Sequence, residues 1–416
     1  MLYHLINYLG NAYDFPGERL VNYISFRAGV GLLLSLLMGL VFGKRIIRLL
    51  KKKLIGEEVR DLGLSGQLQK RGTPTMGGVI ILLCILAPVL LLADLTNMYT
   101  WIMVISAAWL GGLGFLDDYI KVFKRNKSGL HGKFKIVGQV SLGIIVSVLL
   151  YTSDAFVVRD RLPAAAPEAQ QVAAGSAGSL RVIFLGEAHK STKTTIPFFK
   201  NNEFDYAMLA PDFLGEYRQA AGWIIFMLFT IFIVTAVSNG ANLTDGMDGL
   251  AAGVSIVIGI TLGILAYLSG NVIYADYLQI MYIPNSGEVV IFMAIVIGAL
   301  IGFLWYNSYP AQVFMGDTGS LALGGIIAVC AIVIRKELLI PILCGVFFAE
   351  SVSVLLQVCC FKYTKKRYGV GRRVFLMAPL HHHYQKKNLP EAKIVVRFWI
   401  VAALLAIAAV LTLKVR

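Results

Sequence analysis

Charged residues are scarce in this sequence, where Asp, Glu, Lys and Arg together make up 15% of 416 residues. Soluble domains carry about 25% charged residues, so the composition argues against a soluble globular protein. Hydrophobic residues make up 57% of the chain. They are grouped in runs of about 18–22 residues, long enough to cross roughly 30 Å of hydrocarbon. The composition predicts an integral membrane protein with many spans.

Paired cysteines are also lacking. The five cysteines lie in or beside apolar runs, and none forms a Cys-x-x-Cys motif: Cys84, Cys330, Cys344, Cys359 and Cys360. Neither a disulfide framework nor a zinc ribbon is therefore expected. The N-terminal region lacks the short apolar run and small-residue cleavage site of a signal peptide, so the first apolar run is expected to be a retained span.

Ten apolar runs predict an all-α, polytopic membrane protein, a single transmembrane domain over residues 1–416. The expected spans are 22–42, 77–95, 100–116, 134–151, 221–237, 249–268, 288–306, 319–334, 338–361 and 394–413. If the spans alternate, one face of the membrane receives the strongly basic loops 43–76, 117–133 and 362–393. The positive-inside rule makes that face cytoplasmic. The net charge of +14 is thus explained by topology, and nucleic-acid binding is not expected.

Residues 152–220 differ from the rest of the chain. The stretch PAAAPEAQQVAAGSAGS within them is typical of a linker or flexible loop. LRVIFLG, which follows, is a candidate strand. We expect an extracytoplasmic insertion here, with a β-hairpin as its candidate structure and no chemistry of its own.

Two polar motifs flank the second and third spans on the basic face. In KRGTPTMGG, Lys70 offers a cationic donor and Thr73 or Thr75 can cap a helix start that favours an anion; plain anchoring with an ordinary cap is the alternative. In FLDDYIK, Asp117 and Asp118 end an apolar span, where carboxylates are costly and unfavourable to the helix dipole. Adjacent aspartates suit Mg²⁺ and phosphates, although a solvated helix end remains open.

Two further motifs on this face carry Asn and Asp. In NGANLTDGMDGLAAG, Asp245 and Asp248 are three residues apart, so a helix would place both on one side; a polar turn is the alternative. In WYNSYPAQVFMGDTGS, Phe314 can stack on a flat ring, and Asp317 opens the next span, where it could be only the N-cap.

Three adjacent histidines stand in MAPLHHHY, residues 377–384. Neighbouring residues of a helix point about 100° apart, so the three rings cannot face one metal ion. Zinc pairs usually have wider spacing and further ligands. Donation to a phosphate fits this basic loop better. Together, the motifs predict a Mg²⁺–phosphate site at the cytoplasmic face, because metal and lysines must offset the repulsion between two anionic reactants.

The motifs RGTPTMGG, GFLDDYIK, NLTDGMDGLA, PAQVFMGDTGS and MAPLHHHY occur in this order. The chain closely resembles the phospho-N-acetylmuramoyl-pentapeptide transferase family, within the polyprenyl-phosphate N-acetylhexosamine-1-phosphate transferase superfamily. The resemblance implies transfer of phospho-N-acetylmuramoyl-pentapeptide from its UDP donor to undecaprenyl phosphate, with Mg²⁺ as cofactor and UMP as product. It also implies a homodimer in the bacterial inner membrane. The insertion 152–220 and the run 365–373 depart from the family by their length.

The resemblance also implies residue roles. Asp117, Asp118, Asp317 and His381 are the expected catalytic residues, with Asp317 and Asp118 on the metal. The expected substrate-binding residues are Lys70, Thr75, Lys121, Lys133, Asn242, Asp245, Asp248, Asn307, Phe314 and His382. One-step attack by the lipid phosphate is favoured over a two-step route through a carboxylate nucleophile such as Asp317.

Two other functions compete with this one. A sister transferase would use UDP-N-acetylglucosamine, against which the histidine motif argues. A lipid or solute transporter would place its acidic residues at mid-membrane in broken helices, whereas here they stand at span ends.

Overall fold

The computed structural model describes residues 1–13, 18–53, 70, 72–124, 126, 128–159, 187–198 and 203–414. Nine helices in this part of the chain are long and apolar enough to cross a membrane, and α4 is a shorter apolar helix. The helices of the bundle are α3 (Ile24–Lys53), α4 (Gly78–Leu92), α5 (Met98–Val122), α6 (Gly132–Thr152), α8 (Arg218–Thr244), α9 (Leu250–Ser269), α11 (Gly287–Asn307), α12 (Gly316–Val333), α14 (Gly345–Tyr368) and α16 (Glu391–Leu411). The predicted all-α, multi-pass membrane fold is confirmed.

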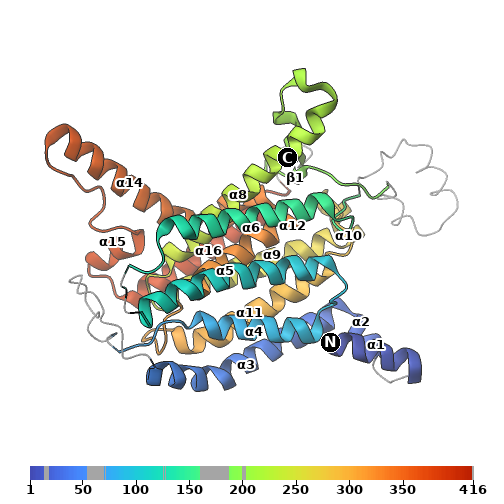
Figure 1. The fold of residues 1–416 in the computed structure, drawn as a ribbon, viewed down its shortest axis with the longest axis horizontal. Helices are drawn as coiled ribbons and strands as arrows, with labels where there is room; N and C mark the ends of the chain where they lie inside the picture. The colour runs from blue at the N-terminus through green and yellow to red at the C-terminus, as the bar shows by residue number, and fades with distance from the viewer. Residues whose placement is uncertain are drawn as a thin grey trace.

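The long helices run side by side, as Figure 1 shows, with α12 at the centre. α12 packs against α4, α5, α8 and α9, and it is buried along nearly its whole length. α11 packs against α3, α4 and α9 on another side of the bundle. Since α12 is shielded by its neighbours, its first turn is a rigid place on which to hold a functional side chain.

Four predicted spans differ from the observed helices by six residues or more at an end: those of α3, α5, α8 and α14. α5 and α8 extend past the predicted C-terminal ends 116 and 237 to Val122 and Thr244. The run expected at 22–42 continues to Lys53 as α3, because basic residues are favourable at the C-terminal end of a helix. The span expected at 338–361 begins later. The short elements η4 (Glu337–Leu339) and α13 (Ile340–Leu343) come first, and α14 then runs on to Tyr368. α14 leaves the bundle obliquely, at the upper left of Figure 1.

Shorter helices surround the bundle. They are α1 (Leu2–Tyr13) and α2 (Glu18–Asn22) near the N-terminus, α10 (Val272–Leu278) after α9, and α15 (Leu380–Lys386), which carries the three histidines. α15 packs against both α14 and α16. The histidine motif is thus a helical element lodged between two long helices.

The insertion contains an antiparallel pair of short strands, β1 (Lys193–Thr195) and β2 (Glu203–Asp205), followed by the 3₁₀ helices η2 (Tyr206–Leu209) and η3 (Asp212–Tyr217). This agrees with the expected β-hairpin, whereas the candidate strand LRVIFLG lies outside the described residues. β1 docks on the turn after α12: the Thr195 N–H donates to Arg335 O at 3.1 Å, and Lys336 Nζ donates to Thr195 Oγ1 at 2.7 Å.

Candidate functional site

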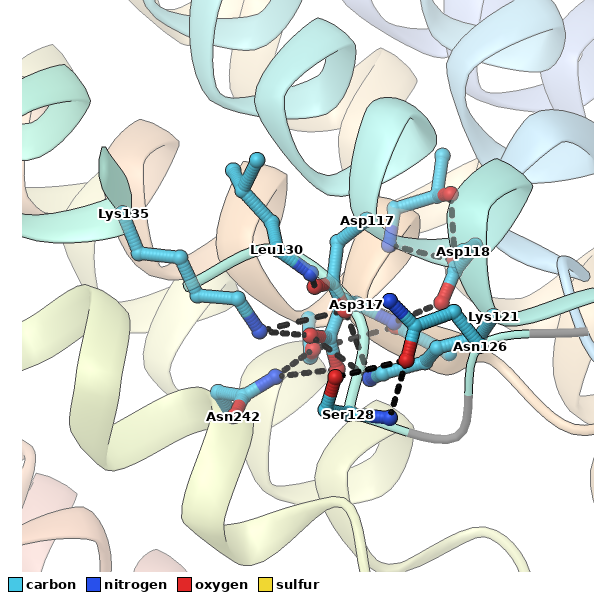
Figure 2. Close-up of polar contacts among 12 residues, drawn as sticks. Asp117, Asp118, Lys121, Asn126, Ser128, Leu130, Lys135, Asn242 and Asp317 are labelled. Carbon is cyan, nitrogen blue, oxygen red and sulfur yellow. Dashed lines mark hydrogen bonds and ion pairs between the residues drawn. The ribbon is translucent and has the colours of Figure 1, made fainter. Parts of the chain in front are cut away.

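Charged side chains meet at the end of the bundle where α5 and α8 end and α12 begins (Figure 2). We call this group the carboxylate–lysine cluster. Its members come from four helices that are far apart in the sequence: Asp117, Asp118, Lys121, Lys135, Asn242 and Asp317. The structure thus brings together residues of three separate motifs and Lys135, which lies in none of the motifs.

Asp117 is fully buried, and its two oxygens have different partners. Oδ2 lies 2.6 Å from Lys121 Nζ, one turn along α5, and 3.1 Å from Lys135 Nζ in the first turn of α6. Oδ1 accepts from the Leu130 N–H at 2.6 Å. The carboxylate therefore holds the α5–α6 connection close while it faces two cations.

Asp118 ties α5 to the start of α12. Oδ1 accepts from the Asp317 N–H at 3.1 Å. Oδ2 accepts from the N–H of Thr318 at 2.9 Å and from its hydroxyl at 2.5 Å. Gly316 precedes them with a φ of 72°, and a Cβ there would lie 2.7 Å from Asp118 Oδ2. Asp118 thus satisfies free N–H groups at a helix N-terminus, a favourable place for a carboxylate.

Asp317 lies in the first turn of α12 and is the meeting point of the cluster. Its Oδ2 lies 3.1 Å from Lys121 Nζ and also pairs with Lys135 Nζ. Its Oδ1 accepts from Asn242 Nδ2 at 2.9 Å. Asp317 therefore does more than start a helix, which was the alternative that the sequence left open.

The three carboxylates fit a divalent cation. Asp117, Asp118 and Asp317 each offer an oxygen, and these oxygens lie within 4.8 Å of one another. Oδ2 of Asp117 is buried and, apart from the two lysine contacts, has no hydrogen-bond partner. Carboxylate oxygens are the ligands that hard cations such as Mg²⁺ prefer. The donor set is thus suited to such an ion.

A second group surrounds Lys70, and we call it the Lys70 pocket: Lys70, Asp248, Asn307, Phe314 and Glu391. Lys70 Nζ lies 2.7 Å from Asp248 Oδ1 and 2.5 Å from Glu391 Oε1. Burial alone would lower the pKa of Lys70, but the charges of Glu391 and Asp248 outweigh it and raise that pKa. Lys70 is therefore a firmly protonated ammonium group.

Main-chain contacts hold the walls of the Lys70 pocket. Asn307 Oδ1 accepts from the Gly249 N–H at 3.0 Å, and its Nδ2 donates to Val313 O at 2.9 Å. The N–H of Phe314 donates to Pro74 O at 2.9 Å, so the segment 72–78 runs beside 313–315. The Phe314 ring lies 5.9 Å from Lys70 Nζ. An aromatic face and a cation thus stand next to each other.

His381 is fully buried beneath the polar surface. Its Nδ1 lies 3.2 Å from Glu350 Oε2, and both side chains are inaccessible to solvent. Gly246 lies against the other nitrogen, since a Cβ at Gly246 would be 2.2 Å from His381 Nε2. The ring therefore joins α14 to the loop that contains Asp245 and Asp248.

The next two histidines are more accessible. Burial, and next the neighbouring His381, lower the pKa of His382 to about 4, so this ring is neutral at neutral pH. Its Nδ1 lies 3.1 Å from Gln385 Oε1. His383 Nδ1 accepts from the Leu376 N–H at 3.1 Å. The three rings have three different partners, as the 100° step of a helix requires.

Asp245 lies between the two groups, in the loop after α8. Burial, together with the negative charges of Asp317 and Asp118, raises the pKa of Asp245 to about 8. Asp245 is therefore influenced electrostatically by the carboxylate–lysine cluster, although the sequence places it beside Asp248.

The other expected residues are placed as follows. Thr75 is half-buried in the segment beside Phe314, and Lys133 is exposed at the start of α6. The sequence reasoning missed three residues of the site: Lys135, Glu350 and Glu391. Lys133 and Lys135 are two residues apart, and such residues on a helix point to nearly opposite sides. Only one of the two lysines could therefore face the other helices, and this spacing was a usable signal. Glu391 stands just before an apolar span, and an isolated acidic residue at the end of a span is a candidate functional residue.

Comparisons with known proteins agree with these groups. The profile of the family described as Glycosyl transferase family 4 matches residues 100–335, and a Phospho-N-acetylmuramoyl-pentapeptide-transferase signature 1 matches residues 70–82. The chain is 57% identical over 416 residues to the phospho-N-acetylmuramoyl-pentapeptide-transferase of Flavobacterium psychrophilum. It is 55% identical over 430 residues to that of Parabacteroides distasonis, and 55% identical over 416 residues to that of Flavobacterium johnsoniae. Each match covers 100% of both chains.

Proposed function

The chain belongs to the phospho-N-acetylmuramoyl-pentapeptide-transferase family, and from this premise we propose that it transfers phospho-N-acetylmuramoyl-pentapeptide from its UDP-linked donor to undecaprenyl phosphate, with release of UMP. The observation that carries the proposal is the carboxylate–lysine cluster. It stands at the end of apolar helices, where a water-soluble donor and a lipid acceptor can meet. Three carboxylates and two lysines there suit a reaction between phosphates.

We assign a Mg²⁺ ion to Asp317 and Asp118, and the Asp117 carboxylate lies beside them with an oxygen within 4.8 Å of theirs. When bound, Mg²⁺ would offset the negative charge of the donor diphosphate and of the acceptor phosphate. The chain's own charges in the cluster are nearly balanced, since two lysines face three carboxylates. A bound divalent ion would make the net charge of the cluster positive and so favour an anionic substrate.

The geometry supports a direct displacement. An oxygen of the lipid phosphate attacks the phosphorus next to the sugar, one P–O bond forms, and the bond to the bridging oxygen breaks so that UMP leaves with the electron pair. Asp117 is assigned to orient or deprotonate the lipid phosphate. Lys121 and Lys135 are assigned to the diphosphate, Lys135 in place of the exposed Lys133 that the resemblance implies. Both lysines are within 3.1 Å of Asp117 Oδ2.

A covalent route through Asp317 is less compatible with the contacts. Asp317 is engaged by Lys121 and Lys135 and accepts from Asn242. Lys121 and Lys135 also pair with Asp117. Of the two carboxylates, only Asp317 accepts in addition from Asn242 and lies in the first turn of the buried helix α12, which favours a fixed binding role over attack on phosphorus. Asp317 is better suited to binding a cation than to attacking phosphorus.

We assign the nucleoside of the donor to the Lys70 pocket. The half-buried Phe314 ring is assigned to stacking on uracil, and Lys70 supplies an ammonium group beside it. Asp248 and Asn307 are assigned to donor binding with Thr75, Asp245 and Asn242. His382, as a neutral ring, is assigned to hydrogen bonding with the donor. His381 is buried, so we assign it an indirect role in transfer: it holds in place the loop that contains Gly246.

The membrane placement is also a proposal. By the positive-inside rule, the basic loops place the end of the bundle that carries the site on the cytoplasmic side of the inner membrane. The 152–220 insertion then lies on the opposite, extracytoplasmic side. This suits a donor made in the cytoplasm. We expect the protein to act as a homodimer, as the family resemblance implies, with mass measurement in native membranes or nanodiscs as the check.

The test is release of UMP by the purified protein. Incubation with UDP-N-acetylmuramoyl-pentapeptide, undecaprenyl phosphate and Mg²⁺ should release UMP and form the lipid-linked product. EDTA should stop the reaction, and UDP-N-acetylglucosamine should not replace the donor. A folded preparation that releases no UMP, or that prefers the N-acetylglucosamine donor, would refute the assignment.

A further inference from the structure

Two amide side chains face each other where α6 packs against α8, outside both groups of the candidate site, and we call them the amide pair. Gln139 Nε2 donates to Asn239 Oδ1 at 3.1 Å, and Asn239 Nδ2 donates to Gln139 Oε1 at 3.0 Å. Asn239 Nδ2 also donates to Thr235 O at 2.9 Å, which fixes the orientation of its amide. Gln139 is fully buried and Asn239 is half-buried. The two helices are thus joined by reciprocal hydrogen bonds.

The amide pair lies one turn behind the two side chains that reach Asp317 from these helices. Lys135 precedes Gln139 by one turn of α6, and on α8 Asn242 follows Asn239 by one turn. Residues three or four apart lie on the same side of a helix. Lys135 pairs with Asp317 Oδ2, whereas Asn242 donates to Oδ1. Figure 2 shows both side chains directed at this carboxylate. The amide pair therefore joins α6 to α8 directly behind their contacts with Asp317.

The position of α6 depends on its neighbours α5 and α8. α8 is itself held close to α12 beside the amide pair, since a Cβ at Gly324 would lie 2.4 Å from Ser238 Cα. On the side of α5, Trp109 Nε1 donates to Gly138 O at 2.9 Å. The reach of Lys135 toward α12 is therefore set by where α5 and α8 hold α6, and the amide pair makes the side-chain link to α8.

We propose, on the basis of the transfer reaction proposed for this chain, that the amide pair positions Lys135 for that reaction. A lysine side chain is long and flexible, so the place of its ammonium group depends on the backbone that carries it. The reciprocal hydrogen bonds form in one register of α6 against α8. A slide of one residue, roughly 1.5 Å, would leave buried amide atoms unpaired, which is unfavourable. The amide pair thus holds the register in which Lys135 lies between Asp117 and Asp317.

The chemical reactivity of Lys135 tests this role without relying on activity. The full chain in detergent, without substrate or metal, is treated with formaldehyde and cyanoborohydride, and mass spectrometry follows methylation of Lys135 relative to the exposed Lys133. Ion pairing should make Lys135 the slower of the two. Gln139→Met, which keeps the length of the side chain, should raise the ratio about fivefold, the factor that one ordinary hydrogen bond represents. An unchanged ratio would overturn the proposal.

The rate of UMP release tests the same link in the reaction. Gln139→Met and Asn239→Leu should each lower kcat about tenfold or more, because a misplaced charge-stabilising group is costly. The exchange Gln139→Asn with Asn239→Gln keeps the combined length of the two side chains and should restore most of the turnover. In a chain that carries Lys135→Gln, the further change Gln139→Met should cost less than about twofold, because changes that act through one group are not additive.

Ser147→Ala is the matched control. Ser147 is buried on the same helix and donates to Gly143 O at 2.8 Å, so the change removes a buried hydrogen bond that stays within α6. It should leave kcat and the methylation ratio unchanged. Equal losses from Gln139→Met with and without Lys135 would reduce the amide pair to a structural contact and overturn the proposal. If the unchanged protein released no UMP, the proposed function would fail instead, and the methylation ratio would still decide whether the amide pair positions Lys135.

Discussion

Asp118 and Thr318 are joined by two hydrogen bonds, one from the Thr318 N–H at 2.9 Å and one from its hydroxyl at 2.5 Å. Both reach the same carboxylate oxygen. They connect the end of α5 to the beginning of α12, two helices separated by about half of the chain. The three carboxylates of the cluster converge because this connection fixes both backbones.

Asp118→Asn should therefore destabilise the protein as well as impair transfer. Asn has one acceptor oxygen where the carboxylate has two, so its NH₂ group must face either the Asp317 N–H or the Thr318 N–H. That buried donor is left unpaired, at a cost of about 1–3 kcal/mol. Thermal unfolding in detergent without metal is the measurement. Asp317→Asn is the comparison, and it should lose activity with a smaller change in the unfolding midpoint. An unchanged midpoint for Asp118→Asn would contradict the anchoring role.

Lys135→Gln should lower turnover about 100-fold, the usual cost of removing one charge-stabilising donor from an active site. Lys133→Gln is the matched control, two residues away on the same helix and exposed. It should remain within a few-fold of the unchanged protein. UMP release at saturating substrate measures both. The reverse order of effects would mean that Lys133 contacts the diphosphate and that the ion pairs of Lys135 are only structural.

Glu391→Gln should weaken donor binding about tenfold, because hydrogen bonds to charged groups contribute about 1.5–3 kcal/mol. Glu391 Oε1 accepts from Lys70 and from the Asp248 N–H, so it positions the Lys70 pocket. The expected signature is a higher KM for the UDP donor with a smaller change in kcat. Lys393→Gln, exposed on the same helix, serves as the control. A fall in kcat at constant KM would count against the assignment of this pocket to the donor.

His381→Ala should abolish transfer and also destabilise the fold. The sequence alone predicts the first effect with an intact fold, whereas burial between Glu350 and Gly246 adds a cavity cost of about 2–3 kcal/mol. Glu350→Gln keeps the volume of the Glu350 side chain and removes its negative charge, so it tests whether His381 needs a charged partner. If His381→Ala unfolded at the same temperature as the unchanged protein, the ring would have no role in holding the loop.

Lys336 gives a prediction about pH. Burial lowers the pKa of Lys336 to about 7, below the value of about 10.4 in an unfolded chain. The unfolded state then binds more protons between these values, so folding stability rises with pH across this window. Thermal midpoints of the unchanged protein should rise from pH 7 to pH 10 relative to Lys336→Met. Lys190→Met, a partly exposed control on the insertion, should show no such trend. Parallel curves for the unchanged protein and for Lys336→Met would contradict the lowered pKa of Lys336.

The number and place of the spans could be predicted from the sequence, since ten apolar runs correspond to α3, α4 and the other long helices. The thickness of the hydrocarbon layer sets the length of an apolar run, but it does not determine where the helix within that run begins or ends. The start of α14 was harder to predict: Pro341 and Cys344 stand where two short helices interrupt the expected span, and the apolar composition does not change there.

The site was predictable as a set of motifs and not as contacts. Asp117 and Asp317 were found because carboxylates at span ends are rare. Lys135 was missed because a lysine near a membrane surface is expected on topological grounds alone, so its direction toward Asp117 left no separate signal. Glu350 lies within an expected span, where an acidic residue was a usable signal. Its pairing with His381, 31 residues away, could not be predicted from the sequence.

Main-chain hydrogen bonds join two segments of the Lys70 pocket, from Phe314 to Pro74, from Gly77 to Phe314 and from Gly78 to Met315. Such bonds do not depend on side-chain identity. The aromatic ring at Phe314 can therefore be replaced without moving the backbone that carries it. A substitution of Phe314 that confers resistance to an inhibitor would thus change recognition of the base and leave the main chain in place. An inhibitor that hydrogen-bonds to this main chain would be less affected by such a substitution.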